Sequence, residues 1–439
     1  MKKQLLICIF WGIMLSGQSQ FVPQPLNYPG QGYWPAYISI SDPEHVWVGT
    51  THEFNIPYSY SIKTSNGGVS WTHDSIPVPG EPYCTSICEW DKNTCFFVFT
   101  DVTEAGGSIW KTTNGGSTWS CMTTNQFDGS FANFYHAFSA NAGVAMGDPK
   151  DGYFVIQVTN DGGETWTRVP SISIPTPLEG EYGMNDSYSA VGNSIWFTTN
   201  KGRCFRSFDR GQHWDVTRVV DVSGGFFDVC FSSEHKGAFF SMNDSTRNIA
   251  VTIDGGINWD TVSIPQSYYI LDMSSVGGFD GGFVFTGWKD LTDVFFTPDM
   301  FTGIVKIGSS IISSGSVAFL DASTGWLAGG ESGTNEIFKY MGVLSSANQG
   351  SAIKHTEKLL IMPNPTSDKA LLKLQSDDVG TKFLTLLITD MCGKVVKQQS
   401  ILSSEWAKLD ASDYDNGIYM VYVFSGNEMP RCVKWVINH

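Results

Sequence analysis

Short apolar runs rich in Val, Phe and Trp alternate along this chain with turns rich in Gly, Asn and Asp, and no long segment has the apolar spacing of a helix. Seven of the runs resemble one another, and each is about as long as a strand. They are "HVWVGT" at His45, "CFFVFT" at Cys95, "GVAMGD" at Gly143, "SIWFTT" at Ser194, "GAFFSM" at Gly237, "GFVFTG" at Gly282 and "GWLAGG" at Gly325. The pattern predicts an all-β chain built from a repeated strand unit.

A Gly-containing turn that ends in Trp follows five of these runs. The copies are "TSNGGVSWT" at Thr64, "TTNGGSTWS" at Thr112, "TNDGGETWT" at Thr159, "SFDRGQHWD" at Ser207 and "TIDGGINWD" at Thr252. The Trp residues of successive copies are 45 to 48 positions apart. A degenerate sixth copy, here called the worn sixth copy, has the sequence "TPDMFTGI" and begins at Thr297. A period in the forties indicates a repeat architecture. Seven strand units at this spacing predict a β-propeller of seven blades with four strands each.

Each copy has the chemistry of a hairpin turn. Asn or Asp followed by Gly supplies the positive-φ positions that such turns need, and the preceding Thr or Ser can bond the turn backbone. The Trp then returns to the core, where we expect it to wedge between adjacent sheets. The structural residues predicted on this basis are Asn66, Trp71, Asn114, Trp119, Asp161, Trp166, Asp209, Trp214, Asp254 and Trp259.

The seventh unit lacks a turn of this kind. It has a predicted inner strand near Gly325 and a partner strand over 336–341. Because a propeller must close its ring, we expect the segment "GYWPAYISI", which begins at Gly32, to supply the missing outer strand. The propeller is thus predicted to span 21–342.

Residues 343–358 are mostly small and polar, and we interpret them as a linker. The pattern of apolar and polar residues changes after this linker. Short alternating strands and turns then fill 359–439. This pattern predicts a second domain, a small immunoglobulin-like β-sandwich.

The N-terminus has the layout of a secretory signal peptide over 1–20. Two Lys precede an apolar run from Leu5 to Leu15, which is too short to span a bilayer, and small residues follow. The chain has a formal net charge of −16, and such acidity disfavours nucleic acid as a partner.

Eight cysteines follow the predicted signal peptide. Cys84, Cys88 and Cys95 are close in sequence, but no His stands near them at the spacing of a zinc site. We expect disulfides or buried thiols, with the pairing left open, and no metal.

The repeated turn resembles the Asp-box, S/T-x-D/N-x-G-x-x-W, of sialidase-type (BNR repeat) propellers, with Arg210 in place of the first Gly in one copy. In that family the boxes lie on the rim, away from the central site. The resemblance therefore implies that their acidic residues are structural and not catalytic.

Three further segments resemble photosystem II assembly factor-like propellers. They are "GVAMGDPKDGYFVI" at Gly143, "EGEYGMNDS" at Glu179 and "CFRSFDRGQHW" at Cys204. That family acts by binding proteins, so the resemblance implies a binding function without chemistry.

The tail over 359–439 resembles the type A sorting domain of the type IX secretion system. The residues that carry this resemblance include Pro363, Asn364, Pro365, Gly393, Lys394, Gly417 and Tyr419. The resemblance implies a protein of Bacteroidota-type bacteria that passes through the periplasm, engages the type IX machinery and is then released or attached to the cell surface.

An enzymatic alternative is a glycoside hydrolase, sialidase-like or xyloglucanase-like. Sialidases clamp a carboxylate with three Arg, but the few Arg of this chain crowd into its middle blades. A two-carboxylate hydrolase remains possible, and an acidic pair could come from Asp148, Asp151, Glu179 and Glu181. Asp-Pro and Asp-Gly pairs are also ordinary turn formers. No dinucleotide fingerprint is present, and we expect no cofactor.

The binding alternative uses aromatic side chains in the loops. Tyr58, His136 and Trp288 are the candidate ligand-binding residues, because aromatic platforms with a few polar groups suit sugars or peptides. We therefore predict a secreted or surface-attached propeller that binds a glycan or a protein, and we favour binding over catalysis.

Overall fold

The structure is a computed structural model of the chain. It describes most of the residues from 20 to 439; those outside the description are 1–19, 25–32, 53–58, 81, 102–105, 222–224, 242–247, 265–268, 289–291, 311–314, 330–335, 346–357, 376–382, 391–394, 403–406 and 425–430. The predicted signal peptide therefore lies outside the described residues. No helix in the described part is long and apolar enough to cross a membrane.

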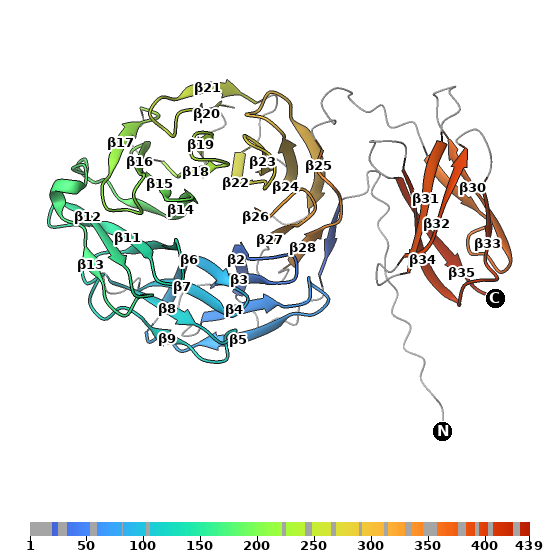
Figure 1. The fold of residues 1–439 in the computed structure, drawn as a ribbon, viewed down its shortest axis with the longest axis horizontal. Coiled ribbons are helices and arrows are strands. Elements are labelled where there is room, and N and C mark those ends of the chain that lie inside the picture. The colour runs from blue at the N-terminus through green and yellow to red at the C-terminus, as the bar shows by residue number, and fades with distance from the viewer. Residues whose placement is uncertain are drawn as a thin grey trace. The chain divides into compact units, whose positions relative to one another are not determined.

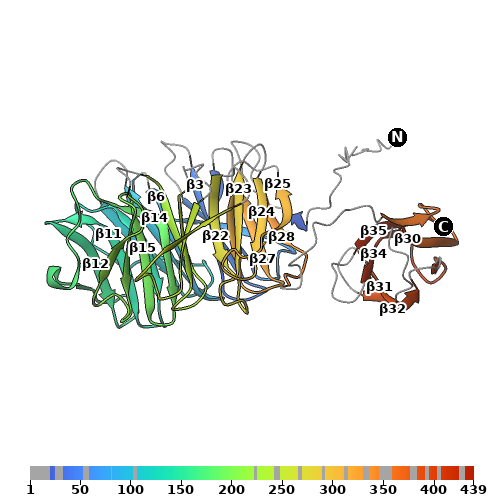
Figure 2. The ribbon, with the colours of Figure 1, turned by 90° about the horizontal axis from the view of Figure 1, so that it is seen from above.

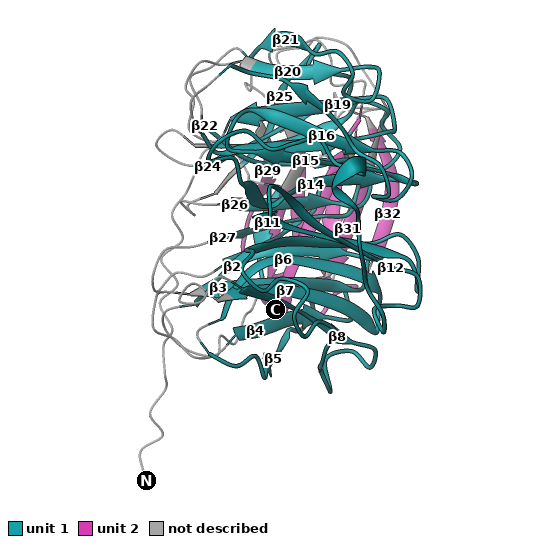
Figure 3. Cartoon of the chain, turned by 90° about the vertical axis from the view of Figure 1, so that its left-hand side faces the viewer, with its two compact units in different colours: residues 1–344 teal, residues 345–439 magenta. Residues whose placement is uncertain are grey.

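The chain forms two compact units, residues 1–344 and 345–439, which Figure 3 shows in different colours. The first unit is a seven-bladed β-propeller, in which seven four-stranded antiparallel sheets surround a common axis (Figures 1 and 2). Apart from one 3-10 turn, η1 at Ser171–Ser173, its named elements are all strands. The predicted all-β propeller is thus confirmed.

The blades follow one another along the chain, and their strands run from the axis outward. Blade 1 consists of β2 (Tyr33–Ile40), β3 (Val46–His52), β4 (Ser59–Thr64) and β5 (Thr72–Ile76). Blade 2 consists of β6 (Pro82–Asp91), β7 (Thr94–Asp101), β8 (Gly106–Thr112) and β9 (Ser120–Cys121). Blade 3 consists of β10 (Ala132–Ala137), β11 (Gly143–Lys150), β12 (Tyr153–Thr159) and β13 (Thr167–Arg168).

The remaining blades repeat this order. Blade 4 consists of β14 (Gly183–Val191), β15 (Ser194–Thr199), β16 (Arg203–Ser207) and β17 (Asp215–Arg218). Blade 5 consists of β18 (Phe227–Phe231), β19 (Gly237–Ser241), β20 (Asn248–Thr252) and β21 (Asp260–Ser263). Blade 6 consists of β22 (Tyr269–Ser275), β23 (Phe283–Trp288), β24 (Thr292–Thr297) and β25 (Val305–Ser310). Blade 7 consists of β26 (Gly315–Phe319), β27 (Gly325–Gly329), β28 (Glu336–Tyr340) and β1 (Phe21–Pro23).

The ring closes differently from the sequence prediction. The outer strand of blade 7 is β1, whose Phe21 pairs with Tyr340, and not the segment that begins at Gly32. That segment contains β2, the innermost strand of blade 1. The prediction was wrong because a three-residue strand has no periodicity to detect, whereas β2 shows a long strand-like pattern.

The apolar runs are also one strand further from the axis than predicted. The run at Gly325, for example, is the second strand of its blade, and β26 is innermost. Second strands are buried on both faces and therefore read as continuous apolar segments. The innermost strands carry polar residues such as Ser86, Asp186 and Asp228, which weaken their apolar signal.

Five box turns, which we define as Thr64–Trp71, Thr112–Trp119, Thr159–Trp166, Ser207–Trp214 and Thr252–Trp259, share one set of hydrogen bonds. In the second, Thr112 Oγ1 donates to Asn114 Oδ1 (3.0 Å) and accepts from Gly116 N (2.8 Å), and Thr118 N donates to Asn114 Oδ1 (2.9 Å). The same three bonds recur at the other four positions. The turn is therefore held by its own side chains.

Three non-Gly residues, Arg210, Met300 and Phe301, adopt the positive-φ backbone that Gly adopts elsewhere in these turns. Arg210, at the first Gly position, has φ 61°. In the worn sixth copy Phe301 has φ 62°, and its N–H still donates to Thr297 Oγ1 at 3.0 Å. The hydroxyl bond thus preserves the turn where the Gly is lost.

The Trp of each box turn lies between its own blade and the preceding one. Trp71 of blade 1 packs edge-on against Trp326 of blade 7, with ring centroids 5.4 Å apart. Trp119 of blade 2 packs against Trp47 of blade 1 at 5.9 Å, and Trp166 of blade 3 donates its indole N–H to Met122 O at 3.0 Å. These indole rings take part in the apolar clusters that lie between neighbouring blades.

The second unit is a small β-sandwich of two sheets, and the predicted sandwich is confirmed. One sheet contains β29 (Lys358–Met362), β30 (Lys369–Gln375) and β33 (Ala407–Asp410). The other contains β32 (Val395–Leu402), β31 (Phe383–Asp390), β34 (Gly417–Phe424) and β35 (Arg431–Ile437). Its core includes Leu386, Val421 and Trp435, which are fully buried.

Candidate functional site

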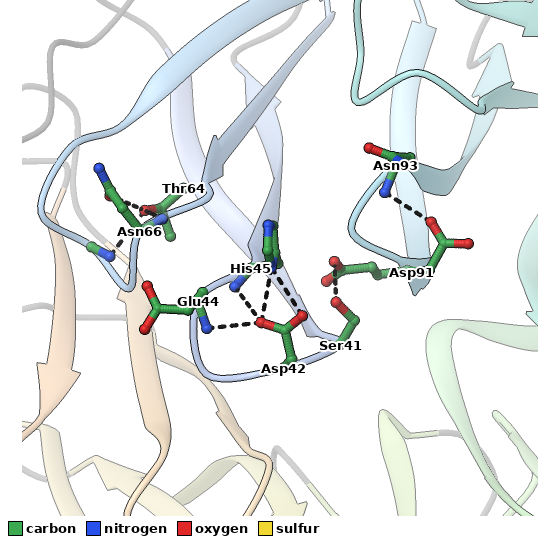
Figure 4. A network of polar contacts seen from close by, with 10 residues as sticks. Ser41, Asp42, Glu44, His45, Thr64, Asn66, Asp91 and Asn93 are labelled. Carbon is green, nitrogen blue, oxygen red and sulfur yellow. Dashed lines mark hydrogen bonds and ion pairs between the residues drawn. The ribbon is translucent and has the colours of Figure 1, made fainter.

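The antiparallel blades place their loops on two faces of the propeller. The first face, here called the box face, carries the box turns and the turns between the first and second strands. In blades 1 and 2, Gly67 N donates to Glu44 O (3.0 Å) and Gly115 N donates to Asn93 O (2.9 Å), and equivalent bonds occur in blades 3 to 6. Figure 4 shows the β2–β3 turn of blade 1, held by Asp42 at His45, together with Thr64 and Asn66 of the box turn and the β6–β7 turn of blade 2. The box face is therefore built from one repeated backbone interaction.

The opposite face, here called the mouth face, carries the loops that enter each innermost strand and those between the second and third strands. Its blade 4 portion contains a buried ion pair. Arg203 Nε donates to Glu181 Oε1 at 2.9 Å and Nη2 donates to Oε2 at 2.8 Å. Thr199 Oγ1 and Leu178 N donate to the same carboxylate at 2.6 and 2.7 Å. Both oxygens of Glu181 are thus already occupied by donors.

Asp148 lies nearby, between blades 3 and 4. Its Oδ1 accepts hydrogen bonds from Asn133 Nδ2 and from Gly183 N, each at 2.9 Å. Burial raises the pKa of Asp148, although these two hydrogen bonds oppose the shift. The carboxylate therefore ties the last part of β11 to the start of β14.

The other two predicted acidic residues are on the surface. Asp151 has φ 60° and pairs with Arg168 at 3.4 Å, and Glu179 is exposed. A hydrolase needs one carboxyl group free to exchange a proton with substrate. Glu181 is fully engaged with Arg203, which removes the most buried member of the proposed acidic set from that role.

The Arg residues of the propeller have local partners. Arg168 and Arg218 pair with Asp151 and Asp221. Among the other described Arg side chains of the propeller, Arg203 bonds Glu181. Arg206 bonds Gly256 O, and Arg210 bonds Asn193 Oδ1. This distribution differs from a three-Arg carboxylate clamp.

Of the three predicted ligand-binding residues, the structure describes the side chain of His136 alone. His136 lies on β10, packed against Phe138 and Tyr188, and burial lowers its pKa to about 4. Tyr58 lies outside the described residues, as does the side chain of Trp288. The backbone of Trp288 ends β23, opposite Tyr269.

A group of carboxylates that sequence reasoning missed lies on the innermost strands of blades 4, 5 and 6. Asp186 on β14 accepts a 2.6 Å hydrogen bond from Ser86 of blade 2. Asp228 on β18 accepts from Ser187 at 2.9 Å, and Asp272 on β22 accepts from Val317 N at 2.7 Å. The three carboxylates, here called the axial carboxylates, are 42 and 44 residues apart in sequence, close to the blade period that could have revealed them.

Burial perturbs all three axial carboxylates. It raises the pKa of Asp186 to about 8 and that of Asp272 to about 6, and it raises the pKa of Asp228 well above its usual range. Mutual repulsion adds to the shift, because Asp272 acts on both Asp186 and Asp228. Each therefore holds its proton to a higher pH than an exposed Asp does.

The described residues contain no group of three His, Cys, Asp or Glu side chains arranged to hold a metal ion. The six described cysteines are free thiols, and all except Cys121 are buried; they are Cys84, Cys88, Cys95, Cys121, Cys204 and Cys230. Cys392 and the side chain of Cys432 lie outside the description.

In the second unit, Asn364 acts as a strand partner for β35. Its Nδ2 donates to Lys434 O (2.6 Å), and its Oδ1 accepts from Val436 N (2.8 Å). Tyr419 donates its hydroxyl to Asp415 O at 3.1 Å. Pro363, Pro365 and Gly417 lie on the described backbone around these residues, whereas Gly393 and Lys394 lie outside it.

Comparison with known proteins supports this division of the chain. Residues 360–438 match the family described as the secretion system C-terminal sorting domain. The sorting domain indicates export by the type IX secretion system, interaction with its machinery, and a secreted or cell-surface protein. None of the curated proteins matches the chain.

Solved structures resemble the propeller. One, described as YCF48 bound to D1 peptide, is 13% identical with a TM-score of 0.53 and covers 75% of this chain and 99% of its own. YCF48 from Cyanidioschyzon merolae is 12% identical with a TM-score of 0.53 and covers 73% of this chain and 98% of its own. At this identity the likeness shows the fold alone.

Proposed function

We propose that the protein is exported through its predicted signal peptide and sorting domain and binds another protein through the mouth face of its propeller. The observation that carries the proposal is a set of exposed aromatic side chains at the entrances to three adjacent innermost strands. Tyr182, Phe226 and Tyr269 precede or begin β14, β18 and β22 and are 45%, 51% and 37% exposed. Exposed aromatic side chains on neighbouring elements are typical of interaction sites.

Two further observations support binding over catalysis. Glu181 is the most buried of the predicted acidic residues. Both of its carboxylate oxygens already accept hydrogen bonds, from Arg203, Thr199 Oγ1 and Leu178 N. In addition, a structural relative is described as bound to a peptide, which is a property of that protein and is consistent with a binding role for this fold. We therefore favour a protein ligand over a glycan and favour both over glycoside hydrolysis.

Site-directed photocrosslinking tests this proposal in the exported protein. A photoreactive phenylalanine replaces Phe226 on the mouth face or, as the matched control, Val69 on a box turn, which is 79% exposed. We expect protein adducts on the cell surface from position 226 and none from position 69. Equal labelling at both positions, or adducts at position 69 alone, would contradict binding through the mouth face.

A further inference from the structure

Three exposed aromatic side chains of the mouth face lie at equivalent places in blades 4, 5 and 6. Tyr182 stands directly before β14, Phe226 directly before β18, and Tyr269 begins β22. Neighbouring innermost strands of these blades are in contact. Blade 1 differs, because its corresponding Tyr33 is only 6% exposed and packs on Tyr60. The exposed rings therefore form an arc, here called the aromatic arc, over one side of the mouth.

The same three strands carry the axial carboxylates a few residues further along. Asp186, Asp228 and Asp272 follow the arc residue of their own strand by four, two and three positions. Each keeps a partly exposed surface, although each is deeply placed among the blades. Their recorded partners are hydroxyls and backbone N–H groups, and none of the ion pairs among the described residues includes them.

We propose that the aromatic arc and the axial carboxylates together bind a cationic peptide segment, with a Lys or Arg side chain on the aromatic rings and its charge directed toward the carboxylates. This inference rests on the proposed function and specifies the partner for the same face. A cation supplies the opposite charge that the described surroundings of the three carboxylates lack. The negative chain, at −16, steers a basic segment toward the protein.

The ligand class follows from the combination of the two features. Aromatic faces attract Lys and Arg, by about 0.5–1 kcal/mol at exposed sites and by more where water is excluded. A neutral sugar would stack on the rings and hydrogen-bond the carboxylates, but it would bring no charge to offset theirs. An acidic peptide would be repelled by ionised carboxylates. Of these three classes, a basic peptide alone supplies both a cation for the rings and a counter-charge for the carboxylates.

Binding of a cation should also release protons. The pKa values of Asp186 and Asp272, about 8 and about 6, are raised by burial, so a nearby positive charge would lower them and ionise the carboxyls. We therefore expect the affinity for a cationic peptide to increase as pH rises from about 6 to about 8.5.

Thiols, phenols and one imidazole that face these strands stay neutral over that range. Burial raises the pKa of Cys84, Cys88, Tyr135, Tyr188 and Cys230, and also that of Tyr37. Burial lowers the pKa of His136 on β10 to about 4. Glu89, with a pKa raised to about 8, lies at the other end of β6, next to the turns of the box face. At the start of β14, Asp148 accepts from Gly183 N and has a pKa that burial raises, and the Glu181–Arg203 ion pair lies beside it. Near the arc, Asp186 and Asp272 are the groups whose pKa values of about 8 and about 6 fall in this range.

Fluorescence anisotropy of the full exported protein tests the inference. The probes are labelled eight-residue peptides of alternating Gly and Lys, Gly and Gln, or Gly and Glu. We expect the Lys peptide to bind at least about tenfold more tightly than the Gln peptide, which corresponds to about 1.4 kcal/mol, and the Glu peptide not to bind. Equal affinity of the Lys and Gln peptides would overturn the inference.

Two variants separate the contributions. Asp186→Asn keeps an acceptor for Ser86 and suits the φ of 53° at this position, because Asn tolerates left-handed backbone. It should weaken Lys-peptide binding at about pH 8.5 and flatten the pH dependence. Phe226→Ala should weaken Lys-peptide binding at about pH 6 and at about pH 8.5. Ile172, which is 93% exposed and lies outside the arc, is the control, and Ile172→Ala should leave binding unchanged at both pH values.

The outcomes also separate this inference from the proposed function. Surface adducts at position 226 without preference for the Lys peptide would leave protein binding intact and reject the cationic segment. Absence of adducts and of peptide binding would reject both. If Asp186→Asn lowers the melting temperature, the inference is tested instead by the pH dependence of Lys-peptide binding to the unmodified protein. An affinity that stays constant or falls between about pH 6 and about pH 8.5 contradicts the inference.

Discussion

The two faces of the propeller are built on different principles. On the box face, one hydroxyl, one Asn or Asp oxygen and one backbone N–H form the same bonds in five blades, as in Thr112, Asn114 and Gly116. On the mouth face the contacts occur once each, as in the pairing of Glu181 with Arg203. A contact that recurs from blade to blade stabilises the blade fold, whereas a contact found in one blade can be adapted to one ligand. The difference indicates that stability is encoded on one face and specificity on the other.

The largest expected effect comes from the buried ion pair between Arg203 and Glu181 on the mouth face. Arg203→Ala leaves the buried Glu181 without its bidentate partner, and removing one partner of such a pair costs about 3–5 kcal/mol. Chemical denaturation measures this loss. Arg218→Ala, which breaks an exposed pair with Asp221, is the control and should change stability little. Similar small losses for both variants would show that the buried pair is dispensable.

A box-turn Trp should rank next. Trp119→Ala removes a ring that packs against Trp47 and Phe97, and truncation of a large aromatic costs about 3 kcal/mol or more. Trp90→Ala is the matched control, because Trp90 is 38% exposed near the end of β6 in the same blade. The wedge role assigned to Trp119 would be rejected if both variants unfolded at the same denaturant concentration.

Glu89 provides a pH-dependent comparison. It lies where other blades carry an apolar residue such as Ile40 or Phe231, and its Oε2 has no hydrogen-bond partner. Burial raises its pKa to about 8, and the hydrogen bond from Ser41 opposes this shift. The folded state therefore holds the proton more tightly than the unfolded state does.

The sign of the effect follows from that difference. The contribution of protonated Glu89 is fully present below a pH of about 4.5 and is lost as pH rises through about 8, by up to about 1.4 kcal/mol per pH unit. Glu89→Met should remove this part of the pH dependence in denaturation curves, while Glu44→Gln, in an exposed turn nearby, should preserve it. Parallel curves for Glu89→Met and the unmodified protein would contradict the shift.

The smallest effect concerns one bond of the repeated set. Thr112→Val keeps the shape of the side chain but leaves Gly116 N without its acceptor, and an unsatisfied buried group costs about 1–3 kcal/mol. Thr118→Val, where the exposed hydroxyl accepts only from Asn114 Nδ2, should cost less. Thermal unfolding of the two variants compares them, and the reverse order would contradict the account of the turn.

The sequence predicted the propeller and its repeat because Asn114-type turns and their Trp recur at a fixed period. It did not predict ring closure by β1, since three residues from Phe21 carry no periodic signal. It placed the apolar runs innermost because it could not see that β14, β18 and β22 carry Asp residues instead.

The candidate site was predicted less well. Asp148 and Glu181 were predicted as candidates for an acidic pair, but sequence could not show that Arg203, 22 positions beyond Glu181, occupies the Glu181 carboxylate. His136 was selected as a ligand residue, although aromatic neighbours enclose it. Tyr182, Phe226 and Tyr269 share no motif, and only their spacing of 44 and 43 residues links them. Contacts made once leave no pattern in a single sequence.

Hydrogen exchange with and without the Lys peptide tests the central claim, that binding is confined to the mouth face of blades 4 to 6, most directly. The account predicts slower exchange on peptide addition at the starts of β14, β18 and β22, around Tyr182, Phe226 and Tyr269, with unchanged exchange in the box turns at Thr64–Trp71 and Thr112–Trp119. Protection confined to the box turns, or spread evenly over all seven blades, would contradict it.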